Sequence, residues 1–177
     1  MMKITFFFKI SALAVGLACT MGANAADGTL TINGTAIAQG CQIQGQSYIV
    51  AVLDFGTVSP AAFPSVGSIS AKKEINFSLI GCPTSVTNVK IMAFGPYDTT
   101  NNKLVPFDAG SSAKGLGIAL YNKDGSQIAM HSFSSYFPID ASTHTANISL
   151  EAALMSTATV VTGGDFTASA LIGMTYD

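Results

Sequence analysis

Two cysteines, Cys41 and Cys82, are the residues of this sequence whose chemistry is easiest to specify. A third cysteine, Cys19, lies in an N-terminal segment with the features of an export signal. In an exported protein a remaining pair of cysteines most simply forms a disulfide, which stabilises a fold of this loop length by roughly 4 kcal/mol. Metal binding or redox catalysis would need further ligands or a Cys-x-x-Cys spacing, and the sequence offers neither.

Other side chains that carry out catalysis are sparse. His131 and His144 are the two histidines, and the serines that follow His131 do not form a Gly-x-Ser-x-Gly nucleophile motif. Gly115-Leu116-Gly117 lacks the third glycine of a dinucleotide-binding loop. The acidic residues are placed singly, without the interleaved spacing of a calcium loop. The sequence therefore predicts no catalytic residue, no metal site and no cofactor.

The first 25 residues have the organisation of a secretory signal peptide. Two lysines precede a short apolar run at residues 10–18, and Ala23-Asn24-Ala25 fits a signal-peptidase site. The run is too short to span a membrane comfortably. Lipoprotein processing at Cys19 is the alternative, although the leucine usual three residues earlier is missing. We therefore expect the mature chain to begin at Ala26.

The charge composition argues against a nucleic-acid partner and fits two classes of protein. The chain has eight lysines and no arginine. Without residues 1–25 it has six lysines and ten acidic residues, which gives a net charge of −4. Nucleic acid is therefore not an expected partner. Charged residues make up 10% of the chain, against roughly 25% in ordinary soluble domains. This composition fits a secreted β-protein, or a subunit whose apolar faces are covered by neighbours.

The C-terminal residues 164–177 predict a β-strand with an apolar face that a neighbouring subunit could cover. Apolar residues alternate with polar ones there, as in a half-buried β-strand, and only Leu171 interrupts the pattern. A strand with an apolar face needs a covering layer and a partner for each edge. The alternating apolar set consists of Phe166, Ala168, Ala170, Ile172, Met174 and Tyr176.

The rest of the mature chain predicts a single all-β domain. Alternating or β-branched segments indicate strands at residues 47–55, 73–80, 89–93, 116–120, 127–130 and 148–154. Asp124-Gly125 predicts a hairpin between two of them. Residues 150–155 have the propensity of a short helix, but no cap marks its ends, so we assign a strand. About eight short strands with turns between them are typical of a β-sandwich.

A second alternating segment lies near the N-terminus, at residues 29–36, where Leu30, Ile32, Gly34 and Ala36 share one face. Asn33-Gly34 is also the best dipeptide for a hairpin turn, so a turn is the alternative interpretation. Because Ile37 follows Ala36, the register is open as well, and a slip of one residue would present the opposite face.

Taken in order, these features resemble the subunits of chaperone–usher pili in the type 1 fimbrial branch. The resemblance covers essentially the whole chain, and each feature is weak by itself. It rests on the export signal, the alternating extension before Cys41, Cys82-Pro83, Leu53-Asp54-Phe55-Gly56, the segment Gly115 to Leu120, Gly164 and the penultimate Tyr176.

The resemblance implies an incomplete immunoglobulin-like sandwich that lacks its last strand. It divides the chain into a signal peptide (1–25), an N-terminal donor-strand extension (26–40) and a pilin domain (41–177). A periplasmic chaperone would fill the gap during export. At the outer-membrane usher, the extension of the next subunit would replace the chaperone by donor-strand exchange. The product would be a cell-surface fimbrium, which would reach any host receptor only as an assembled fibre.

The resemblance also implies roles for individual residues. Leu30, Ile32, Gly34 and Ala36 would form the donor face, with Gly34 allowing close backbone approach. In the last strand, Gly164, Phe166, Ala168, Ala170, Ile172, Met174 and Tyr176 would form the acceptor groove and the chaperone contact. The alternative is that the last-strand residues are ordinary core of a closed sandwich.

Three other functions are weighed against a structural fimbrial subunit. A tip adhesin of this family usually has an extra N-terminal lectin domain and no donor extension, which is the reverse of this sequence. A chain-terminating minor pilin would have the extension but a blocked groove, and the sequence does not separate it from a shaft subunit. A secreted enzyme is the poorest fit, because no catalytic arrangement is present.

Overall fold

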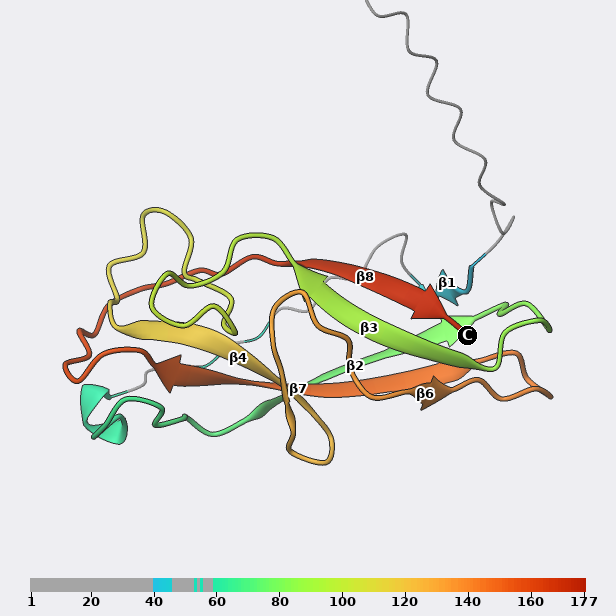
Figure 1. The fold of residues 1–177 in the computed structure, drawn as a ribbon, viewed down its shortest axis with the longest axis horizontal. Helices are drawn as coiled ribbons and strands as arrows, with labels where there is room; N and C mark the ends of the chain where they lie inside the picture. The colour runs from blue at the N-terminus through green and yellow to red at the C-terminus, as the bar shows by residue number, and fades with distance from the viewer. Residues whose placement is uncertain (1–39, 46–52, 54, 56–58) are drawn as a thin grey trace, which may run out of the picture. The chain divides into compact units, whose positions relative to one another are not determined.

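The structure is a computed structural model that describes residues 40–45, 53, 55 and 59–177. These residues belong to one compact unit, residues 37–177. They form eight strands and a single turn of 3-10 helix, and no α-helix occurs among them (Figure 1). The strands are β1 (Gln42–Ile43), β2 (Lys73–Ile80), β3 (Asn88–Phe94), β4 (Leu116–Asn122), β5 (Gln127–Ile128), β6 (Phe137–Pro138), β7 (Ala146–Ser156) and β8 (Leu171–Tyr176), and the helix is η1 (Pro60–Ala62).

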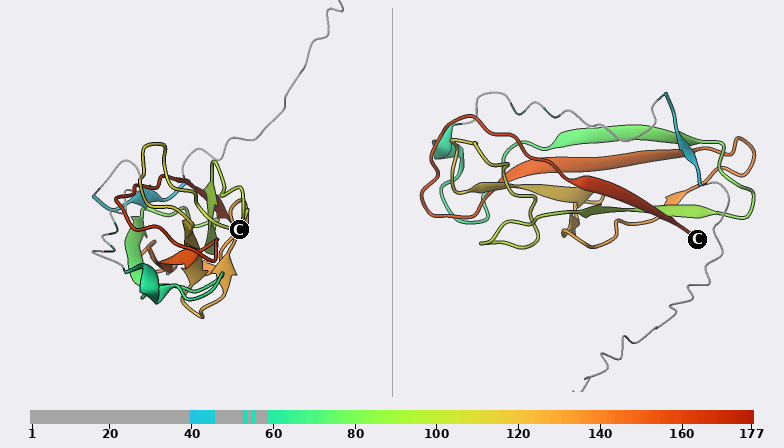
Figure 2. Two further views of the ribbon diagram at one scale, coloured as in Figure 1. Left: turned by 90° about the vertical axis from the view of Figure 1, so that its left-hand side faces the viewer. Right: turned by 90° about the horizontal axis from the view of Figure 1, so that it is seen from above.

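The strands make two antiparallel sheets that pack face to face. The larger sheet has the order β1-β2-β7-β4-β5, and the smaller has the order β6-β3-β8. Figure 2 shows the two sheets from two further directions. Apolar residues from both sheets meet between them; Ile91 of β3, for example, lies in one buried cluster with Ile148 and Leu150 of β7. The prediction of an all-β sandwich is confirmed.

Alternation along the strands decides which side chains enter the core. In the β2–β7 pair, Ile75 lies opposite Leu150 and Phe77 lies opposite Ile148, so the apolar residues of both strands share one face. The strand assignment of residues 150–155 is confirmed, because β7 is paired along its length with β2 on one side and β4 on the other. Tertiary pairing thus outweighs the helical propensity of that segment.

The predicted hairpin is present, and the predicted last strand is shorter than its sequence pattern. Asn122 accepts a hydrogen bond from Gly125 N–H at 2.9 Å and closes the turn between β4 and β5. The ladder of β8 covers residues 171–176 rather than the predicted 166–176. Leu171 pairs with Phe94, which ends β3, and Gly95 then turns away with a positive φ of 131°. The earlier residues of the predicted strand consequently have no β3 residue left to pair with.

The turn between β6 and β7 contains a carboxylate that serves as a backbone acceptor. Asp140 Oδ1 accepts hydrogen bonds from Ser142 Oγ at 2.6 Å, Ser142 N–H at 2.8 Å and Thr143 N–H at 3.0 Å. The Ser142 hydroxyl, followed by the Thr143 and Ser142 amides, lowers the pKa of Asp140 from 3.8 to about 2. The ionised side chain thus closes the turn that leads into β7.

We expect this turn to add a component to acid sensitivity. Because the folded pKa is depressed, the stabilisation is complete above pH 3.8 and is lost as pH falls from 3.8 towards about 2. Asp140→Asn keeps an acceptor oxygen but removes the titration. The difference in urea midpoint between the wild type and Asp140→Asn should therefore be constant above pH 5 and shrink below pH 3.8. A difference that does not change with pH would contradict this assignment.

Candidate functional site

An apolar groove with a volume of about 560 Å³ lies beside residues 166–170 and Ile172, the second residue of β8. Leu53 and Phe55 also line it. Its other lining residues come from β2, β3, β4 and β7 and from the loop before β4, and we call them the groove floor: Ile75, Phe77, Ile91, Val105, Ile118, Leu120 and Leu150. A groove of this composition can bury aliphatic side chains of an inserted segment.

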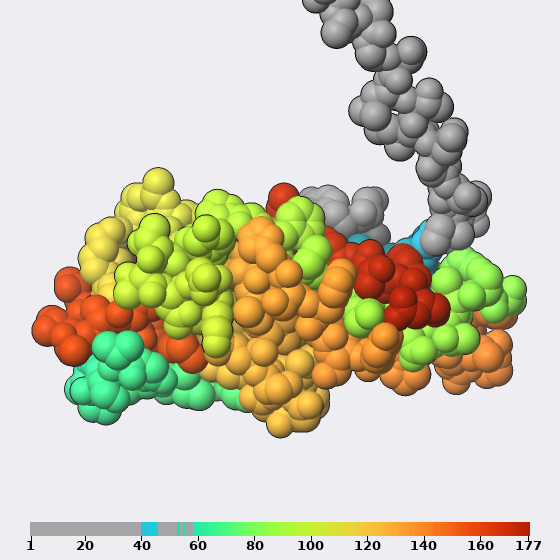
Figure 3. Space-filling view, in the orientation of Figure 1, coloured from blue at the N-terminus to red at the C-terminus, as the bar shows by residue number. Residues whose placement is uncertain are grey.

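One edge of β8 is without a neighbour among the described strands. β8 ends the three-stranded sheet, paired with β3 alone, and reaches the surface in the space-filling view (Figure 3). Asp177 N–H donates to Asn88 O at 3.0 Å, and Asn88 N–H donates to Asp177 O at 3.1 Å. Because bonded and non-bonded pairs alternate in an antiparallel ladder, residues 172, 174 and 176 direct their N–H and C=O groups to the other edge. That edge is therefore equipped to pair with an added strand.

Aromatic rings close the end of the groove that lies farthest from the C-terminus. Phe166 stacks on Phe107 with ring centroids 4.4 Å apart and planes inclined by 10°. The Phe55 ring also lies beside Phe166, with centroids 6.2 Å apart and planes inclined by 45°. Rings packed in this way fix the shape of that end, because stacked aromatic pairs add to simple area burial.

The structure places the predicted last-strand residues in three different surroundings. Phe166, Ala168, Ala170 and Ile172 line the groove. Met174 and Tyr176 pack against the core cluster that contains the cysteines. Gly164 lies against the loop at residues 111–113, where an added Cβ would come within 2.4 Å of Ser112 Oγ.

Several other predicted positions lie outside the residues that the structure describes. Leu30, Ile32, Gly34 and Ala36 lie outside the described residues, as do the domain boundaries at 25 and 26 and most of the strand predicted at 47–55. The sequence did not identify the groove floor. Its residues are the apolar positions of predicted strands, but their place under a gap depends on sheet order, which local patterns do not encode.

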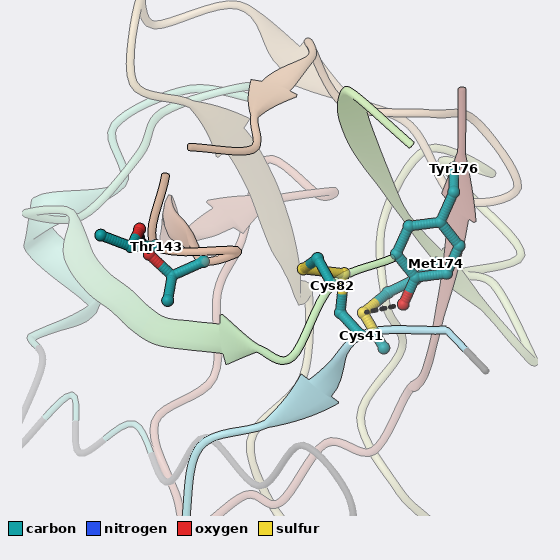
Figure 4. Close-up of a disulfide and its surroundings, with 6 residues drawn as sticks. Cys41, Cys82, Thr143, Met174 and Tyr176 are labelled. Atoms are coloured by element: carbon teal, nitrogen blue, oxygen red, sulfur yellow. Dashed lines mark hydrogen bonds between the residues drawn. A yellow bond between two sulfur atoms is a disulfide. The ribbon is translucent and has the colours of Figure 1, made fainter. Parts of the chain in front are cut away.

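The predicted disulfide is present and borders the C-terminal end of β8. Cys41 and Cys82 are bonded, with their Cα atoms 4.2 Å apart, and both are buried. Met174 and Tyr176 extend from β8 towards this pair, and the Tyr176 hydroxyl donates to Met174 Sδ at 3.7 Å (Figure 4). The Tyr176 ring also lies 3.0 Å from the position of a Cβ at Gly40. Burial raises the pKa of Tyr176 despite a hydrogen bond with the Cys41 backbone, so its hydroxyl is neutral at physiological pH.

The described part of the chain has neither a cluster of metal-ligating side chains nor a membrane-spanning helix. No group of three His, Cys, Asp or Glu side chains there is placed to hold a metal ion. Among the same residues, no helix combines the length and apolarity that crossing a membrane demands.

Comparison with known proteins decides the family. The sequence profile described as "Fimbrial protein" matches residues 15–177. The chain belongs to the fimbrial protein family. It is 30% identical over 142 residues to the fimbrial protein FimX of Bordetella pertussis, a match that covers 70% of this chain and 69% of FimX. The resemblance to chaperone–usher pilus subunits predicted from the sequence is thus confirmed, and the chain is a structural fimbrial subunit.

Solved structures support the fold of this fimbrial subunit. The P pilus rod subunit PapA matches with a TM-score of 0.64 at 19% identity, covering 78% of this chain and all 100% of PapA. A chain from a chaperone–usher pilus structure matches with a TM-score of 0.63 at 20% identity, covering 86% of this chain and 97% of that one. The predicted immunoglobulin-like sandwich of a pilin is confirmed by this likeness, and family and fold are those of a structural pilin.

Proposed function

We propose that this fimbrial subunit polymerises by donor-strand exchange, with its groove accepting the N-terminal extension of a neighbouring subunit. The observation that carries the proposal is the open edge of β8 beside an apolar groove of about 560 Å³. Strand addition satisfies such an edge with main-chain hydrogen bonds and fills the groove with alternate side chains. Each buried leucine or isoleucine contributes roughly 1.5–3 kcal/mol.

The alternation of the extension has the two-residue period of a strand that would pair beside the groove. The added strand of a complete immunoglobulin-like sandwich runs antiparallel to its neighbour. If Leu30 lies opposite Ile172, then Ile32 falls opposite Ala170, and Gly34 falls opposite Ala168. Ala36 then falls opposite Phe166, whose ring stacks on that of Phe107. We therefore assign the donor face to Leu30, Ile32, Gly34 and Ala36.

The same groove explains the partners that we propose for export. An open apolar edge invites aggregation, so a periplasmic chaperone must cover the groove before polymerisation. An outer-membrane usher would then exchange the chaperone for the next subunit. The product would be a surface fimbrium, with the subunit reaching it through the periplasm after removal of residues 1–25.

Grafting the extension onto the other end of the domain tests this function. In the self-complemented chain, residues 40–177 are followed by a Gly/Ser linker of about four residues, long enough for a hairpin return, and by a copy of residues 26–40. We expect a soluble monomer with one cooperative thermal transition. The matched control ends in a Gly/Ser segment of the same length and should aggregate or melt at least about 5 °C lower, because a loss of about 2 kcal/mol lowers the Tm of a chain of this size by about 4–8 °C. Equal melting of the two proteins would refute the proposal.

A further inference from the structure

A short loop binds the residues that precede β8 by using two side-chain hydroxyls as a substitute strand. We name residues 108–113 the serine loop and residues 165–169 the lead-in segment. Asp165 N–H donates to Ser112 Oγ at 2.9 Å, and Thr167 N–H donates to Ser111 Oγ at 3.2 Å. The two hydroxyls donate in return to the carbonyls of the same residues, at 3.3 Å from Ser112 and 3.4 Å from Ser111. Each serine thus serves the N–H and the C=O of one residue, as a strand neighbour would.

Backbone and carboxylate groups of the serine loop complete the attachment. Asp108 N–H donates to Thr167 O at 2.8 Å, and Ser112 N–H donates to Asp165 O at 2.9 Å. Ser169 Oγ donates to Asp108 Oδ2 at 2.9 Å. Gly164 permits the close approach, because an added Cβ would meet Ser112 Oγ at 2.4 Å. The loop therefore continues the support of the last strand beyond the point where β3 ends.

The serine loop forms hydrogen bonds with alternate residues of the lead-in segment. Its partners are Asp165, Thr167 and Ser169, which have the same odd numbering as the β8 residues bonded to β3. Among the residues that the structure describes, the backbone groups of Phe166 and Ala168 have no hydrogen-bond partner. Phe166 and Ala168 line the groove, as do Thr167 and Ser169 beside them. The segment thus already has the alternation of a strand with one occupied edge.

We propose that the hydroxyls of Ser111 and Ser112 keep the lead-in segment extended before the groove is filled, so that its second edge can pair with an incoming strand. They are positioning residues for strand addition, and the inference rests on the proposed function. An apolar groove wall without this attachment would lose its fixed edge, and an incoming strand would have to order it during association. Once the strand is in place, its own ladder holds Phe166 and Ala168, and the two hydroxyls become dispensable.

Peptide association separates this role from simple stability. The mature chain, residues 26–177, is diluted from denaturant at low concentration into an excess of a labelled synthetic peptide of residues 26–40, so that peptide binding outcompetes aggregation, and association is followed by fluorescence anisotropy. For the double variant Ser111→Ala/Ser112→Ala we expect association about tenfold slower than for the wild type, because the four hydrogen bonds of the two exposed hydroxyls are lost from the lead-in segment. The Tm of the finished complex should change by less than about 3 °C, within the range of a surface substitution. Ser111→Thr keeps a hydroxyl at that position and should associate at the wild-type rate.

Controls distinguish failure of this inference from failure of the proposed function. Ser132→Ala is the matched control, because Ser132 is exposed and its hydroxyl has no hydrogen-bond partner among the described residues. It should associate like the wild type. Association of the double variant at the wild-type rate would overturn the positioning role, as would an equal slowing by Ser132→Ala. A wild-type chain that does not bind the peptide at all would instead refute donor-strand exchange. Should the double variant not fold, the single variants test the inference: hydrogen exchange should become faster at the Thr167 amide in Ser111→Ala and at the Asp165 amide in Ser112→Ala, and unchanged exchange would overturn the inference.

Discussion

Replacing Cys41 and Cys82 together by alanine should lower the free energy of unfolding of the self-complemented chain by about 4 kcal/mol. The bond joins residues separated by 41 positions, so its loss restores much conformational freedom to the unfolded chain. It also frees Gly40 and Cys41 from their place beside the Tyr176 ring. Urea denaturation followed by circular dichroism measures the effect. A loss of this size is a large share of the 5–15 kcal/mol that is typical of a whole domain.

Two measurements on the wild-type chain verify that the effect belongs to the disulfide. The wild type in a reducing buffer should unfold at the urea concentration of the double variant. Alkylation of the unreduced, unfolded mature protein should find no free thiol. Free thiols in the wild type, or a double variant within about 1 kcal/mol of it, would contradict a structural role for the bond.

The strands that the sequence predicted best are those with neighbours on both sides. In β7 the alternate residues Ala146, Ile148 and Leu150 are all buried, and the sequence pattern shows the same alternation. The two-residue strands β1 and β6 were missed, because pairs this short have no measurable period. Alternation is a property of a single segment, so it can be recognised in the sequence without knowing which strand is the partner.

The extent of the last strand could not be read from its own sequence. Phe166, Ala168 and Ala170 continue the alternation of β8, yet the ladder begins at Leu171. The reason lies in β3, which ends at Phe94 opposite Leu171 and turns at Gly95. The sequence marks Gly95-Pro96 as a strand end, but not which residue of the last strand lies opposite it. Register between distant segments is a tertiary property.

The candidate site was predictable in outline and not in detail. The pattern of residues 164–177 indicated an apolar strand in need of cover, and four of its predicted residues, Phe166, Ala168, Ala170 and Ile172, line the groove. The support from Ser111 and Ser112 gave no sequence signal, because two adjacent serines before a buried strand are usually surface polar residues. Their role appears only when the fold brings them within hydrogen-bond distance of Asp165 and Thr167.

Replacing Ile32 by aspartate should abolish the capacity of a subunit to donate its extension while leaving its own groove able to accept one. In the proposed register Ile32 enters the groove opposite Ala170, which lines it with apolar neighbours. A carboxylate there would be buried without a partner, at a cost of several kcal/mol. Incorporation of the variant's extension into neighbours should therefore fall by at least about a hundredfold.

The acceptor and donor roles can be measured on the same variant protein. Ile32→Asp chains should bind a labelled wild-type peptide of residues 26–40 at the wild-type rate, because β8 and the groove floor are unchanged. A peptide carrying Ile32→Asp should not bind to wild-type chains. Thr31→Asp is the matched control: residue 31 faces away from the groove in the proposed register, so its added charge stays in water and incorporation should be nearly normal. If Thr31→Asp blocks incorporation and Ile32→Asp does not, the register is shifted by one residue and Ile37 replaces Ala36 at the aromatic end of the groove.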